Sequence, residues 1–190
     1  LKEGESHGGL NPNRKATDYR PFNASLADQW IMCKYWKTLE FVKSELDSYK
    51  ISEAGDLIYH FIWDDFCNWY IESTKANSTN PSTLVAVYRD ILKLAHPLCP
   101  FITEKIWQEL FPNDEMLISQ NLPDKKDYKL EEEYENEALN KFETVQSIVT
   151  EIRKVRAEKK LNPKEKISVK ISAGAKERAL TETIEVMKVL

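Results

Sequence analysis

Glycine is nearly absent from the long middle part of this sequence. Between Leu10 and Ala173 the only glycine is Gly55. Sheet-rich folds need glycine in their tight turns, and phosphate-binding loops need it where the backbone approaches the ligand closely. The loop patterns G-x-G-x-x-G and G-x-x-x-x-G-K are also missing. The sequence therefore favours a mainly helical body and argues against a nucleotide-binding site within it.

Composition narrows the class of protein further. With 190 residues, 42% of them hydrophobic and 31% charged, we expect one soluble globular domain, or one domain and the beginning of a second. The net charge of −4 means that nucleic-acid binding would need a local basic face. Three widely spaced cysteines and three scattered histidines favour neither a disulfide framework nor a metal site, so we expect an intracellular protein. No apolar run is long enough to cross a membrane.

Hydrophobic periodicity predicts an irregular lead-in over residues 1–24 and then a helical bundle over residues 25–162. Ser25 and Asp28 resemble a capping box, and the first helix is expected to end near Tyr49 and Lys50. Its core stripe is predicted to consist of Ile31, Tyr35, Leu39, Val42, Leu46 and Tyr49.

The second helix is expected from about Ser52 to Lys75. It is apolar on more than one side, so it is predicted to be the central helix of the bundle. Pro81 suits the first position of a third helix, which the prolines of the segment 96–100 end. A short helix follows, with Ile102, Ile106, Trp107 and Leu110 on its stripe.

A long connection is predicted over residues 111–130, with a short extended stretch at Met116–Ile118. The last long helix is expected from about Glu131 to Lys160, with a core face of Ala138, Phe142, Val145, Val149, Ile152 and Val155. Alternation over 166–172 predicts a strand, and a final helical stretch follows it. Residues 163–190 therefore read as the beginning of a small α/β module.

The aromatic block Phe61–Tyr70 is the most unusual stretch of the chain. Core packing is the simpler explanation, and Trp63, Phe66, Trp107 and Phe142 are predicted core residues. The alternative is a groove that stacks nucleotide bases. Asp64 and Asp65 are adjacent on one helix, which does not suit paired acid–base catalysis, and at least one of them is expected to hydrogen-bond or pair with a neighbouring helix.

The basic run near the end of the last long helix also allows two interpretations. Cations near a helix C-terminus suit the helix dipole, so a solvated charged face explains the run. A patch that contacts phosphates is the alternative. The run consists of Arg153, Lys154, Arg156, Lys159, Lys160, Lys164 and Lys166.

Several segments together resemble the anticodon-binding domain of class I aminoacyl-tRNA synthetases, most closely the valyl-tRNA synthetases. The similarity extends from about residue 25 to 172. The segments that carry it are L-A-D-Q-W-I at 26–31, F-I-W-D-D-F-C-N-W-Y-I-E at 61–72, L-K-L-A-H-P-L-C-P-F-I-T-E-K-I-W at 92–107, R-K-V-R-A-E at 153–158 and L-N-P at 161–163.

This resemblance implies a fragment of a larger enzyme, because the family's catalytic motifs and editing domain are missing. The full-length enzyme would use ATP to attach valine to its tRNA, whereas this part would hold the anticodon stem-loop. We expect no catalytic residue, metal or cofactor here, and a cytoplasmic monomer whose partners are valine-specific tRNA and the catalytic and editing domains.

The family pattern places an apolar residue of the anticodon pocket directly after the Trp-Tyr pair, which is Ile71 here. Asn68 and Lys75 are predicted to lie beside it on the same helix face. Arg153, Arg156 and Lys159 are predicted to face RNA or a neighbouring module. Two alternatives stay open, namely the same domain of an isoleucyl or leucyl enzyme, and a helical protein-interaction module without an RNA role.

Overall fold

The computed structural model describes residues 24–75, 80–124, 132–162 and 167–169. The elements are α1 (Leu26–Asp47), α2 (Ile51–His60), the π-helical segment η3 (Phe61–Tyr70), α3 (Ile71–Thr74), α4 (Pro81–Ala95), α5 (Pro100–Leu110), the 3-10 helix η4 (Leu117–Ser119) and α6 (Glu132–Glu158). The predicted mainly helical bundle is confirmed. None of the described helices could cross a membrane.

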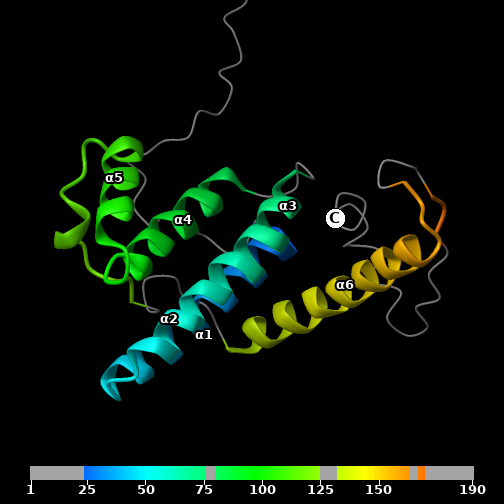
Figure 1. Ribbon diagram of the computed structural model, residues 1–190, viewed down its shortest axis with the longest axis horizontal. Helices are drawn as coiled ribbons and strands as arrows, with labels where there is room; N and C mark the ends of the chain where they lie inside the picture. Colours follow the sequence, from blue (N-terminus) through cyan, green and yellow to red (C-terminus); the bar gives the residue numbers. More distant parts are fainter. Residues whose placement is uncertain (1–23, 76–79, 125–131, 163–166, 170–190) are drawn as a thin grey trace, which may run out of the picture.

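Two long helices form a hairpin at the centre of the molecule. Figure 1 shows α1 side by side with the continuous helix made of α2, η3 and α3. The hairpin turns at Tyr49, whose φ is 60°. α1 contacts α2, η3, α4 and α6. The second helix, predicted to be central, packs on α1 and reaches α4 through Phe66 and Tyr88 and α6 through Trp69 and Phe142, so it shares the central place with α1.

Local signals set the beginnings of α1 and α4 as expected. The Ser25 hydroxyl accepts the amide of Asp28, and the Asp28 carboxylate accepts the amide of Ser25, which completes the predicted capping box. Pro81 occupies the first turn of α4 behind the N-cap Asn80.

The hydrophobic core confirms three of the four predicted core aromatics. Phe66, Trp107 and Phe142 are buried, whereas Trp63 is 55% exposed. The π-helical segment explains the error. Its i→i+5 hydrogen bonds widen each turn, so each residue turns by a smaller angle about the helix axis than in an α-helix. The buried positions of this helix therefore include a step of five, from Phe61 to Phe66, and Trp63 faces outward together with Tyr59.

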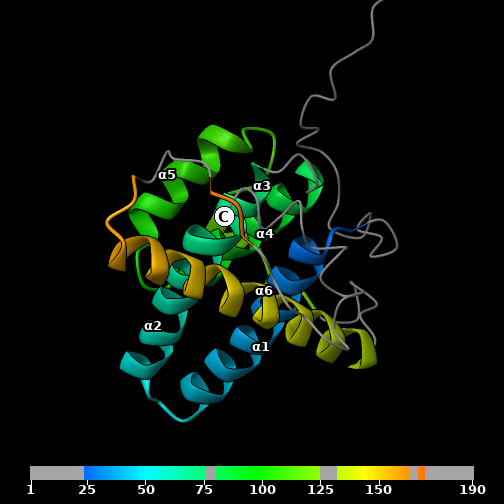
Figure 2. The ribbon, with the colours of Figure 1, turned by 90° about the vertical axis from the view of Figure 1, so that its right-hand side faces the viewer.

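The ends of two predicted stripes are also exposed. On the first helix, Leu46 and Tyr49 are exposed, because the tip of the α1–α2 hairpin projects away from α4, α5 and α6 (Figure 1). On the last helix, Ala138, Phe142, Val145 and Val149 are buried, whereas Ile152 is half-buried and Val155 is 42% exposed. Figure 2 shows α6 crossing in front of α1, and Figure 1 shows its C-terminal end leaving the other helices.

A second, smaller core lies where α4, α5 and η4 meet, and consists of Leu92, Trp107, Phe111 and Leu117. Only one side of α5 is covered, so the predicted stripe residues Ile102 and Leu110 are exposed. Residues 117–119 form a 3-10 turn, which corrects the extended stretch expected at Met116–Ile118.

The predicted C-terminal module lies almost wholly outside the described residues. Residues 167–169 have irregular backbone and belong to no strand in the part that the structure describes. The strand at 166–172 and the final helical stretch are otherwise outside the described residues, as is nearly all of the lead-in 1–24.

Candidate nucleic-acid interface

The predicted anticodon-pocket residues lie where the second long helix changes from π to α geometry. Asn68 is exposed in the last turn of η3, Ile71 is half-buried at the start of α3, and Lys75 is exposed at the helix end. Ile71 packs against the main core on its inner side. It therefore combines a structural contact with a partly accessible surface.

Side chains around Ile71 hold the end of this helix. The Ser73 hydroxyl donates to the carbonyl of Trp69 at 2.8 Å, and the Thr74 hydroxyl donates to the carbonyl of Ile71 at 2.7 Å. The Lys75 ammonium lies 2.6 Å from both carboxylate oxygens of Glu72. Because the Lys75 side chain is 58% exposed and that of Glu72 is 38% exposed, solvent weakens this ion pair, and the lysine can exchange Glu72 for a phosphate at small cost.

Trp69 brings the two predicted groups of RNA-binding residues together. The Arg153 guanidinium of α6 lies 5.1 Å from the centroid of the Trp69 ring. The same ring meets Phe142 edge-on at 6.5 Å, and Phe142 stacks on Trp30 of α1 at 4.1 Å. A row of rings thus runs from the core to the basic end of α6, and a cation–π contact ends it at the surface.

The other two predicted cations lie at the end of α6. The Arg156 guanidinium donates to the carbonyl of Asn162 at 3.0 Å, and the amide of Leu161 donates to the carbonyl of Arg156 at 3.0 Å. Arg156 therefore helps to hold the turn after the helix. α6 ends at Glu158, so Lys159 lies in this turn, where it is exposed.

The buried carboxylate of Asp28 holds the helix that carries Ile71 in place through hydrogen bonds. Asp28 accepts the Tyr70 hydroxyl at 2.7 Å, the amide of Asn80 at 3.0 Å, and both the amide and the hydroxyl of Ser25. Burial raises the pKa of Asp28, and these hydrogen bonds oppose the rise. The carboxylate thereby ties together the starts of α1 and α4 and the residue directly before Ile71. Sequence reasoning recognised the capping box but missed Tyr70.

The adjacent acids of η3 behave as structural groups. Asp65 pairs with Lys34 of α1 at 3.1 Å, as expected for at least one of them, and Asp64 contacts His60 one turn back. Burial raises the pKa of Asp65, and the Lys34 charge opposes the rise. Within the described ranges no three His, Cys, Asp or Glu side chains lie close enough together to hold a metal ion.

Sequence comparison identifies relatives over most of the chain. Residues 28–171 match the family model for the anticodon-binding domain of tRNA ligase. Valine–tRNA ligase of Halalkalibacterium halodurans is 37% identical over 158 residues, which cover 78% of this chain and 18% of that protein. The corresponding enzyme of Carboxydothermus hydrogenoformans is 36% identical over 148 residues, 73% of this chain and 16% of the relative.

The enzyme of Treponema denticola aligns over a longer stretch. It is 32% identical over 182 residues, which cover 86% of this chain and 20% of the relative. The chain thus spans only about a fifth of the length of the curated relatives that it matches. By the family match and by these identities, the chain belongs to the anticodon-binding domain family of the tRNA ligases.

Proposed function

We propose that this chain binds the anticodon stem-loop of tRNA as part of a valine–tRNA ligase. The observation that carries the proposal is the family match over residues 28–171, together with relatives that are valine–tRNA ligases. The ligase as a whole attaches valine to its tRNA with ATP, and its catalytic and editing parts lie outside the 190 residues. We propose that it works as a cytoplasmic monomer and that residues 25–162 form the anticodon-binding unit.

Bases are proposed to enter beside Ile71. Sequence-specific proteins read single-stranded RNA loops by stacking on bases and by hydrogen bonds to their edges. Ile71 offers a half-buried apolar surface, and Asn68 offers an exposed amide one turn before it. The Lys75 ammonium lies at the helix end, where it pairs with Glu72 at 2.6 Å. Apolar contact, edge recognition and phosphate contact thus come from one short stretch of helix.

Phosphate contacts are proposed for the basic end of α6. Arg153 is held on the Trp69 ring, next in sequence to Asn68, so α6 approaches the base-binding stretch at this point. Arg153 and Lys159 are exposed there and Arg156 is half-buried. Cations that contact phosphates fix the register of RNA on the protein and make binding weaken as salt rises.

The test uses steady-state kinetics of the full-length ligase that contains this sequence. Ile71→Asp and the charge reversals Arg153→Glu and Arg156→Glu should raise the KM for tRNA at least about tenfold, the effect of about 1.4 kcal/mol. The KM for valine should stay unchanged, because the aminoacylation site lies elsewhere. Ile51→Asp and Lys43→Glu are matched controls, since both residues are exposed on the central hairpin outside the proposed interface.

Thermal unfolding of each variant separates binding from folding. If Ile71→Asp lowers the melting temperature by many degrees, or if it charges tRNA normally, Ile71 is a core residue and the anticodon is read elsewhere. The protein-interaction alternative makes a different prediction, because it expects no affinity for tRNA at all. An affinity that falls steeply between low and moderate salt excludes that alternative.

A further inference from the structure

The outer side of α5 is an exposed apolar surface. Trp107 and Thr103 face inward and are buried, whereas Phe101 is 91% exposed and Ile102 is 57% exposed. The neighbouring segment adds Met116 and Ile118, which are 56% and 73% exposed. Contiguous apolar side chains of this size on a soluble protein mark an interaction site.

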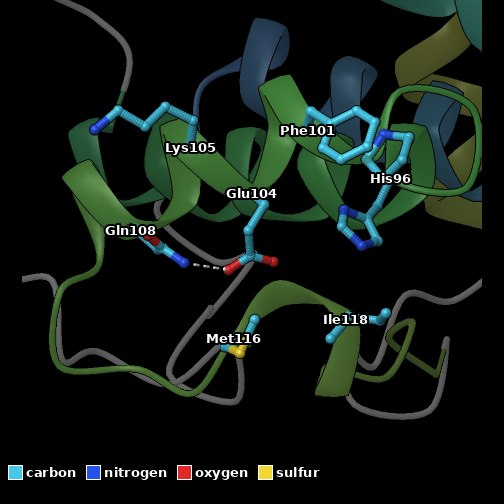
Figure 3. Close-up of a pocket in the computed structure, with 8 residues that line it drawn as sticks. His96, Phe101, Glu104, Lys105, Gln108, Met116 and Ile118 are labelled. Carbon is cyan, nitrogen blue, oxygen red and sulfur yellow. Dashed lines mark hydrogen bonds between the residues drawn. The ribbon is translucent and has the colours of Figure 1, made fainter.

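A hollow of about 340 Å³ lies between α5 and η4 within this surface. Figure 3 shows Phe101 at one end of it, Met116 and Ile118 along its floor, and the Glu104 carboxylate pointing into it from α5. The hollow is therefore mainly apolar and contains one acidic group.

The Glu104 carboxylate is only half satisfied in the described part of the chain. Its Oε1 accepts the side-chain amide of Gln108 at 3.0 Å, whereas its Oε2 is shielded from solvent and has no hydrogen-bond partner there. A shielded carboxylate oxygen without a donor costs free energy. Because Oε2 is shielded, an occupant of the hollow removes that cost only if the carboxylate turns and presents this oxygen to an N–H group of the occupant.

The charges around the hollow favour a polypeptide over RNA. Among the described residues that line it, Lys105 is the one lysine or arginine, and its ammonium pairs with Glu109 at 3.0 Å. Glu104 adds a negative charge to its lining, and Arg89 is already paired with Asp114. Such surroundings repel phosphates, whereas they suit an arginine or lysine that lies beside an apolar side chain.

The lengths of the relatives indicate where a polypeptide that fills the hollow comes from. The chain spans 16–20% of the valine–tRNA ligases that it matches, so most of such an enzyme lies outside it. We propose that the hollow between α5 and η4 docks another part of the same ligase, which packs an apolar side chain on Phe101 and donates to Glu104 from an arginine or lysine. This inference rests on the proposed function for the identity of the parent enzyme.

Photo-crosslinking in the full-length ligase tests the docking site directly. A photoreactive phenylalanine replaces Phe101 in one variant and, as a control, Phe41 in another, because Phe41 is a 59% exposed aromatic on α1. We expect the probe at 101 to crosslink within the same molecule to a peptide outside residues 1–190 that contains arginine or lysine. Crosslinks to added tRNA, to a second copy, or only within residues 1–190 would overturn the proposal, as would a yield no higher than that of the control.

Hydrogen exchange provides a second readout without a probe. In the full-length ligase, Phe101→Glu should raise amide exchange in residues 100–110 about tenfold, and Glu104→Gln should raise it less, whereas Phe41→Glu should leave it unchanged. Equal exchange in all four proteins would overturn the proposal. Neither experiment measures tRNA charging. The docking proposal can therefore fail while the RNA-binding proposal stands, and the RNA-binding proposal can fail while the docking proposal stands.

Discussion

The hydrogen bond from Tyr70 to Asp28 gives a sharp test of how the bundle is held together. Both side chains are fully buried, and the Tyr70 hydroxyl lies 2.7 Å from Oδ1 of Asp28. Tyr70→Phe removes this hydroxyl and keeps the ring, whose centroid lies 5.8 Å from that of Phe66. Because a hydrogen bond to a buried charged group contributes about 1.5–3 kcal/mol, we expect the free energy of unfolding to fall by about 2–3 kcal/mol.

The penalty should also depend on pH in a defined direction. The pKa of Asp28 is raised from its ordinary value of 3.8, chiefly by burial, and the Tyr70 hydroxyl opposes the rise. Between the unfolded and folded pKa values the native state binds more protons than the unfolded state, so the contribution of Asp28 to stability falls as pH rises through this window. Without Tyr70 the pKa rises further. The penalty of Tyr70→Phe is therefore largest near neutral pH and shrinks as acid protonates Asp28.

Urea unfolding, followed by far-ultraviolet circular dichroism, measures this penalty at several pH values between about 4 and 7. The free energies of the two proteins can be compared where their m values are equal. Tyr59→Phe is the matched control, because Tyr59 is 59% exposed and loss of its hydroxyl should change stability by less than about 0.5 kcal/mol. A Tyr70→Phe penalty as small as that of the control near pH 7, or one that grows on acidification, would refute the reasoning.

Two further predictions concern the aromatic side chains. Trp63→Ala should cost about 1 kcal/mol or less, since Trp63 is 55% exposed, whereas Trp107→Ala should cost about 3–5 kcal/mol because its ring is fully buried; similar losses in urea unfolding would contradict the exposure of Trp63. Arg153→Ala should cost about 0.5–1 kcal/mol through its contact with Trp69, and the exposed neighbour Lys154→Ala should cost nothing measurable. Equal values for these two would show that the ring contact does not contribute to stability.

Sequence reasoning succeeded where the determining interactions are local. The capping box of Ser25 and Asp28 spans three residues, and Pro81 acts within its own turn, so both could be recognised without knowledge of the fold. The same holds for most of the apolar stripe of the first helix, which stays regular. The predicted stripe extended too far, to Leu46 and Tyr49, which are exposed. Only the tertiary arrangement decides where the tip of a hairpin projects past its neighbours.

Trp63 shows where periodicity fails. A stripe with 3.6 residues per turn would place Trp63 in the core, but η3 is π-helical over ten residues, and an i→i+5 turn moves each following side chain to a different face. The contact between Trp69 and Arg153 was equally out of reach, because it depends on how α6 crosses the second helix. No short-range pattern in the sequence encodes that crossing.

The three residues Trp69, Tyr70 and Ile71 are fixed from three directions. Trp69 contacts Phe142 and Arg153 of α6, Tyr70 donates to Asp28 at the start of α1, and Ile71 packs against the main core. A binding site works best when its residues are displayed from a rigid support. The exposed amide and ammonium proposed to contact RNA flank this fixed triplet on either side. It follows that Tyr70→Phe, although its hydroxyl is buried beneath the proposed interface, should weaken tRNA binding along with stability, since it loosens the frame that presents them.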